Sequence, residues 1–186
     1  PASIFAGDQR VQRVRTPILH WDSPLTSDTT TAGKDACRWG FVYSAGDIGD
    51  DWDLSSAALK RWRVVAFHQW TKSYHTVRAV FPANRTILFN QPAPFYYGQF
   101  VTNTASGKRY YIEGALEIPL HQGSAAFRLH PGGLLEYPDY GNKDRGLRDQ
   151  DRRPVVVQVP VLQRLLSINH APGVELHGLR MLHTTI

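Results

Sequence analysis

The chain is poor in sulfur, with one cysteine, Cys37, and one methionine, Met181, among 186 residues. A single cysteine excludes an internal disulfide framework, although a chain of this length can build a core without one. Apolar runs stay well short of the ~20 residues that a membrane helix needs, so no membrane span is expected. The chain starts at Pro1-Ala2 without an initiator methionine or a signal-peptide pattern, from which we expect a processed chain or a fragment.

Charge of one sign is also limited. Hydrophobic residues make up 42% of the chain and charged residues 20%, an ordinary globular composition that excludes intrinsic disorder. The net charge of +5 suits nucleic acid or an anionic polysaccharide. Basic residues are scattered, however, apart from segments 10–15 and 145–153, and no nucleic-acid motif accompanies them. We therefore expect no nucleic-acid partner.

Strict two-residue alternation of apolar and polar side chains recurs along the chain, which is typical of half-buried strands. Segment 108–113 alternates, and segment 126–130 does so before the turn Pro131-Gly132-Gly133 and a return strand. Segment 61–70 carries apolar residues on both faces, which indicates a central strand. Segments 73–80 and 86–90 continue an antiparallel pattern, whereas 19–34 is rich in turn-forming residues and is expected to be a loop. The fold predicted is all-β, an antiparallel sandwich or barrel-like domain.

Two groups of side chains suggest metal binding. The loop after Tyr43 contains Asp47, Asp50, Asp51 and Asp53, and clustered carboxylates suit calcium. Their spacing does not fit the twelve-residue helix–loop–helix site, so a solvated turn is the alternative. His68 and His75 form a candidate metal pair, with hydrogen-bonded packing as the alternative, and no further ligand cluster accompanies them. The sequence therefore predicts no metal centre and no cofactor, with calcium at the acidic loop kept as an option.

Aromatic residues supply the candidate binding site. Tyr96 and Tyr97 occupy a loop interrupted by prolines, where such rings either stack on sugars or cover a core. If the protein binds glycans, the predicted platform consists of Trp70, Tyr74, Tyr96 and Tyr97. The triplet Asn84-Arg85-Thr86 is an N-glycosylation sequon at a turn, so Asn84 is the predicted glycosylation site.

Two segments carry a resemblance to a known family. In the first, an Arg-aromatic strand is followed by a Glu, a Gly, an aromatic strand and a Leu-Tyr strand that ends in Pro. The matching residues are Arg109, Tyr110, Tyr111, Ile112, Glu113, Gly123, Phe127, Leu129, Gly133, Leu134, Tyr137 and Pro138. The second segment has a Val, a Leu, a Gly, an apolar strand and a His-Thr-Thr end. It comprises Val174, Leu176, Gly178, Leu179, Leu182, His183, Thr184 and Thr185. The pattern resembles extracellular carbohydrate-active proteins built on a right-handed parallel β-helix, many of them glycoside hydrolases.

The resemblance implies a division of the chain and a function. Residues 1–153 would form a β-rich inserted domain, and residues 154–186 the incomplete start of the β-helix. Because stacked coils bury one another, a further β-helix chain, fragment or subunit would cover the strand ending at Ile186. The family is secreted and hydrolyses glycosidic bonds with paired carboxylates, which lie on later coils outside this chain. The catalytic residues therefore stay unknown, and the protein is either part of a glycosidase or a non-catalytic structural or glycan-binding assembly protein.

Overall fold

The computed structural model describes residues 4–6, 9–26, 33–68, 70–97, 108–120, 126–136 and 157–158. The chain divides into two compact units. One comprises Val14–Pro119, and the other comprises Pro1–Arg13 together with Leu120–Ile186. Strands dominate the described part of both units, so the all-β prediction is confirmed.

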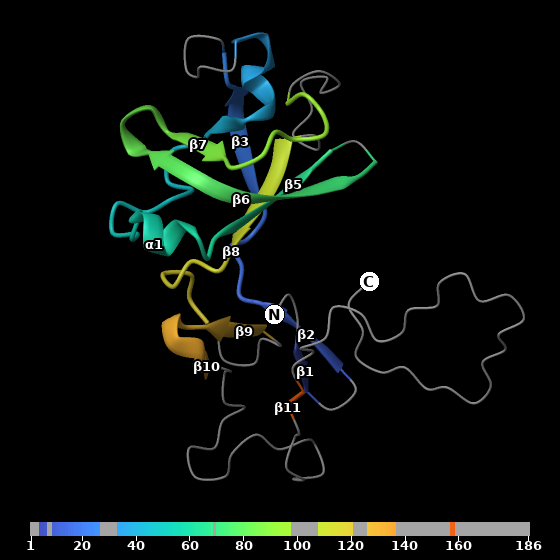
Figure 1. The fold of residues 1–186 in the computed structure, drawn as a ribbon, viewed down its shortest axis with the longest axis vertical. Helices are drawn as coiled ribbons and strands as arrows, with labels where there is room; N and C mark the ends of the chain where they lie inside the picture. Colours follow the sequence, from blue (N-terminus) through green and yellow to red (C-terminus); the bar gives the residue numbers. More distant parts are fainter. Residues whose placement is uncertain are drawn as a thin grey trace, which may run out of the picture. The chain divides into compact units, whose positions relative to one another are not determined.

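The unit Val14–Pro119 is a closed antiparallel barrel (Figure 1). Its strands are β3 (Leu19–Pro24), β4 (Gly40–Tyr43), β5 (Arg63–Phe67), β6 (Lys72–Phe81), β7 (Thr86–Phe89) and β8 (Arg109–Glu113). They follow the order β3-β4-β7-β6-β5-β8 around the barrel, and β8 pairs with β3 to close it. Closure satisfies backbone groups that an open sheet would leave unpaired at its edges.

One sequence-based prediction about the barrel is wrong. Segment 19–34 was expected to be a loop, but β3 pairs with both β4 and β8. Trp21 explains the difference, because its indole is buried in the barrel while Ser23 and Pro24 give the strand the composition of a turn. Burial of one large ring on one face outweighs weak local strand propensity.

The barrel interior is filled by aromatic rings. Phe41 on β4 contacts the rings of Tyr110 on β8, Tyr97, Phe89 on β7 and Trp21 on β3, with centroids 4.8, 5.4, 5.7 and 6.1 Å away. Offset and edge-on arrangements of this kind add to the stabilisation from burial alone. One ring therefore joins strands from several sides of the barrel.

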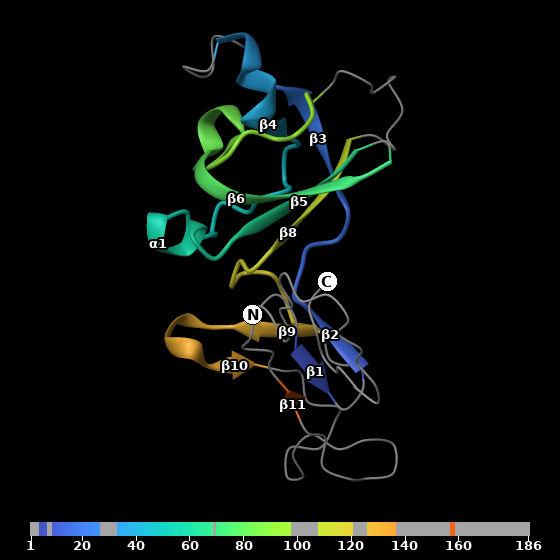
Figure 2. The same cartoon turned by 45° about the vertical axis from the view of Figure 1, so that its right-hand side comes forward.

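Short helical turns link the strands. Helix α1 (Ser56–Leu59) lies beside β6 (Figure 2), and its N-cap Ser55 accepts a hydrogen bond from the Ala58 amide at 3.3 Å. The cap satisfies one of the backbone amides that the first helical turn leaves without an intrahelical partner. The 3-10 turns η2 (Gly33–Arg38) and η3 (Pro82–Asn84) precede β4 and β7.

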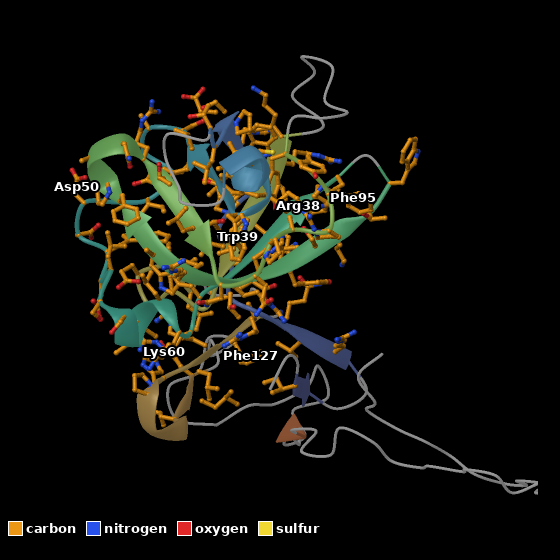
Figure 3. All side chains as sticks on the ribbon, turned by 45° about the horizontal axis from the view of Figure 1, so that its top comes forward. Arg38, Trp39, Asp50, Lys60, Phe95 and Phe127 are labelled. Atoms are coloured by element: carbon orange, nitrogen blue, oxygen red, sulfur yellow. The ribbon has the colours of Figure 1, made fainter. Side chains whose placement is uncertain are left out.

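The other unit contains a sheet ordered β10-β9-β2-β1-β11. Its strands are β1 (Ile4–Ala6), β2 (Gln9–Arg13), β9 (Ala126–Leu129), β10 (Leu135–Glu136) and β11 (Val157–Gln158). The predicted hairpin around 131–133 is confirmed, since β9 and β10 pair antiparallel on either side of η5 (Pro131–Gly133). Phe127, labelled in Figure 3, is buried with Ile4 and Val11 in a small core. β2 and β9 run parallel.

The β-helix part of the prediction falls outside the described residues. The predicted domain boundary between residues 153 and 154 and the strand pattern 174–186 both lie there. Within the described residues, no helix is both long and apolar enough to span a membrane.

Candidate functional site

The hairpin of β5 and β6 carries the most exposed large ring of the described residues. The His68 amide donates a 2.7 Å hydrogen bond to the Thr71 carbonyl and closes the turn between the strands. Trp70 lies within this turn, and its side chain is 85% exposed. An indole in this position buries almost nothing, so it contributes little to the core.

A network of hydrogen-bonded polar side chains lies next to this turn. The Ser73 hydroxyl is 2.7 Å from His68 Nε2 and 2.6 Å from His75 Nε2. The Tyr97 hydroxyl is 3.0 Å from the same His75 nitrogen, and Phe89 stacks on the His75 ring at 4.1 Å. The structure thus agrees with the hydrogen-bonded alternative for the two histidines.

The number of protons limits which hydrogen bonds this network of side chains can form. The Ser73 hydroxyl has one proton, so it can donate to one imidazole and must accept from the other. Burial, and secondarily the neighbouring His68, lowers the pKa of His75 to about 4. Burial also lowers the pKa of His68 and raises that of Tyr97. A serine beside a histidine is the arrangement of an activated nucleophile, but Ser73 and His75 are buried, so the group ties strands together.

This burial predicts a pH dependence of stability. A neutral His75 contributes fully above the unfolded-state pKa of about 6.5, and the contribution is lost as pH falls towards 4. The shift from about 6.5 to about 4 corresponds to a loss of about 3 kcal/mol in the free energy of unfolding by pH 4. Urea titrations at a series of pH values from 7.5 to 4 measure it. His75→Gln should flatten this slope; an unchanged slope would contradict the assignment.

The predicted aromatic platform divides into exposed and buried rings. Tyr74 on β6 is 51% exposed, and Tyr96 is partly exposed with the Arg38 guanidinium 5.4 Å from its ring centre. Tyr97 is 4% exposed and packs inside the barrel. It is therefore part of the core and cannot belong to an exposed platform. Phe95, which the sequence analysis passed over, is 44% exposed. Figure 3 labels Phe95 and Arg38, which lie on the side of the barrel where the hairpin ends.

A second surface lies on the outer face of β6, β5 and β8. Because Val65 pairs with Tyr74 and with Tyr111, these three side chains form one row across the strands. Arg63 lies opposite Thr76 and Glu113 in the next row. The row on the other side contains Lys72 and Phe67, which pair directly, and Arg109 of β8. We call the residues of these three rows, together with Arg15, the outer face.

Cations cover the rings of the outer face. Arg15 lies 4.7 Å from the centre of the Tyr111 ring, and Arg109 lies 5.1 Å from that of Phe67. Arg63 and Lys72 lie 5.1 and 5.4 Å from the centre of the Tyr74 ring, and a hydrogen bond to Tyr74 raises the pKa of Lys72. Such cation–π contacts fix the charged groups above the sheet.

The glutamates take part in structural contacts. Arg63 Nε donates to Glu113 Oε2 at 2.8 Å, and its NH2 group contacts the same oxygen. Glu117 Oε1 accepts from the Asp53 amide at 3.0 Å. In the other unit, Glu136 contacts His130 and Arg128 at 2.7 and 2.9 Å, and the His130 hydrogen bond lowers its pKa. The arrangement of these three carboxylates does not mark any two of them as a catalytic acid and base.

The acidic loop uses its carboxylates for hydrogen bonds within the fold. Asp47 accepts from the Tyr110 hydroxyl at 2.6 Å and from the Ser44 amide at 3.2 Å. Asp53 accepts from the Ser55 amide at 2.9 Å. The described residues contain no group of three or more potential metal ligands. Calcium at this loop stays a prediction. Asn84 is exposed in η3, and its glycosylation also stays a prediction.

Sequence reasoning missed the outer face as a unit. Each strand showed its own alternation, but Arg15, Arg63, Lys72 and Arg109 are far apart in the chain. The pairing of β5 with β6 and β8, and the bridge between Arg15 and Glu113, bring them together. The signal present in the sequence was a basic residue at the outward positions of successive strands.

Comparison with known proteins adds no relative. The chain matches no protein-family model, no curated protein and no solved structure.

Proposed function

We propose that the barrel is a glycan-binding domain and that the protein is a secreted, carbohydrate-active protein. The carrying observation is the exposed indole of Trp70, held at the closed end of the β5–β6 hairpin. Flat rings offer large contact area to the apolar faces of sugars at small conformational cost. Exposed Phe95 reinforces this, because its ring lies 5.3 Å from that of His68, at the base of the same hairpin.

The hairpin is suited to hold such a ring in place. His68, directly after β5, is hydrogen-bonded to Ser73 on β6, and the Ser73 hydroxyl also contacts His75. Binding to a prepared surface loses less conformational entropy than binding to a loose loop. This hydrogen-bonded network would thus hold the turn that carries Trp70 in a fixed position.

The engaged glutamates favour binding over catalysis within this chain. Glu113 is paired with Arg63, and Glu136 with Arg128 and His130. The resemblance to β-helix glycoside hydrolases supports the wider proposal that catalytic carboxylates lie on a continuing β-helix. That β-helix chain, fragment or subunit would cover the strand predicted to end at Ile186, and the mass of the native assembly would reveal it. A non-catalytic glycan-binding assembly protein is the alternative.

Replacement of Trp70 tests the binding function. Trp70→Ala should weaken binding to a glycan retained on an oligosaccharide array about fivefold, since one ring contact contributes about 1 kcal/mol. The midpoint of thermal unfolding should hardly change, because the indole is outside the core. Titration calorimetry with the retained oligosaccharide measures the affinity.

Phe81→Ala provides a matched control, since Phe81 is also an exposed ring, at the other end of β6. It should bind like the unmodified chain. Equal affinity of the Trp70 and Phe81 variants would remove the hairpin from the binding site. Failure of the unmodified chain to retain any glycan would refute the proposed function.

A further inference from the structure

The outer face of the barrel has a charge that the aromatic platform does not explain. Arg15, Arg63, Lys72 and Arg109 contribute four positive charges, and Glu113 contributes the one carboxylate of these three rows. The balance is three positive charges on the surface of three neighbouring strands. Like charges gathered in this way repel one another and attract an anionic ligand.

The cations are held in place. Each lies within 5.4 Å of the centre of an aromatic ring, and Arg63 is additionally fixed by two contacts to Glu113 Oε2. Long basic side chains normally lose considerable rotamer entropy on binding. Contacts that already restrict them reduce this loss, so the face is prepared for a ligand.

We propose that the outer face binds a carboxylated glycan, such as a uronic-acid-containing polysaccharide, and so determines which class of glycan the domain prefers. This inference rests on the proposed function, because it adds a charge preference to a glycan-binding barrel. Guanidinium groups match a carboxylate with two parallel hydrogen bonds. The contact of Arg63 with Glu113 shows that a carboxylate fits among these side chains.

The distribution of charge favours a carboxylated glycan over its competitors. Three net charges spread across three strands suit a ligand with about one charge per sugar better than a densely sulfated chain. Single-stranded nucleic acid binds through bases stacked on open aromatic faces. Here Tyr74, Tyr111 and Phe67 already have cations above their rings, so the face offers positive charge in place of open rings.

The test compares the full chain with two charge variants. The double variant Lys72→Gln/Arg109→Gln removes two cations of the outer face, whereas Arg10→Gln/Lys60→Gln removes two exposed cations elsewhere. The probes are an array of neutral, uronate-containing and sulfated oligosaccharides, the best uronate ligand after carboxyl reduction, and a single-stranded oligonucleotide. Thermal unfolding of each variant confirms that it is folded, and the single variant Lys72→Gln serves if the double variant is not.

The expected result is selective retention of uronate-containing glycans. Their affinity should fall roughly tenfold in the outer-face variant, fall likewise on carboxyl reduction, and stay unchanged in the control variant. Retention of neutral glycans with no loss on carboxyl reduction would overturn the inference and leave the glycan-binding function standing. Preference for sulfated glycans, or oligonucleotide binding lost in the same variant, would also overturn it. Retention of no glycan would refute both.

Discussion

A Gly40→Ala variant is expected to lower the free energy of unfolding by at least about 3 kcal/mol, which combines overpacking with backbone strain. Gly40 begins β4 with φ of 156°, where its backbone pairs with β7. A Cβ at this position would overlap the Ile87 carbonyl oxygen. That oxygen belongs to the backbone and cannot move away without separating two barrel strands. Urea denaturation followed by tryptophan fluorescence measures the loss.

Gly46→Ala separates the two causes. Gly46 also has a positive φ, of 86°, but a Cβ there would meet no atom within 4 Å. The variant should lose only about 1 kcal/mol, the cost of a left-handed conformation for a residue with a side chain. If both variants lost the same amount, the close approach of β4 and β7 would not be the cause.

Phe41→Ala is expected to cost about 3–5 kcal/mol, because it leaves a cavity that rigid barrel strands cannot collapse to fill. The lost ring contacts involve Trp21, Phe89, Tyr97 and Tyr110, which come from all round the barrel. The near-ultraviolet circular dichroism of these rings should weaken as well. Denaturant titration and that spectrum together measure the effect.

Phe81→Ala is the matched control for this change also. The same side chain is removed, but Phe81 is 47% exposed at the end of β6, so the expected loss is within about 0.5 kcal/mol. Comparable losses at the two positions would mean that the rings inside the barrel do not hold it together.

Much of the barrel could be predicted from local alternation. Segment 108–113 alternates and segment 61–70 carries apolar residues on both faces, and the strands β8 and β5 lie within these two segments. Closure could not be predicted in this way, because it depends on pairing between β3 and β8, which are about ninety residues apart. β3 itself was missed since a single ring, Trp21, determines its face.

The candidate site shows the same limit. Alternation placed Trp62 and Trp70 on the same face of one strand, yet Trp62 is buried and Trp70 is exposed, because β5 ends at Phe67. Tyr96 and its neighbour Tyr97 likewise have the same local chemistry and different burial. Tyr97 packs against Phe41 inside the barrel and its hydroxyl is 3.0 Å from His75 Nε2, and neither partner is near it in the sequence. Strand pairing also assembled the outer face, so its charge was visible in the sequence only as scattered arginines and lysines.

The path of the chain into and out of the barrel has a practical consequence. Arg15 pairs with Glu113, and the Thr16 amide donates to the Ile112 carbonyl at 3.0 Å, so the chain enters the unit Val14–Pro119 beside the end of β8, its last strand. A unit with adjoining ends can be inserted into a host chain, or removed from one, with little change to the host backbone. The barrel should therefore fold when it is inserted into a loop of another protein through these two connections, and it should keep the side chains on its surface in the same arrangement.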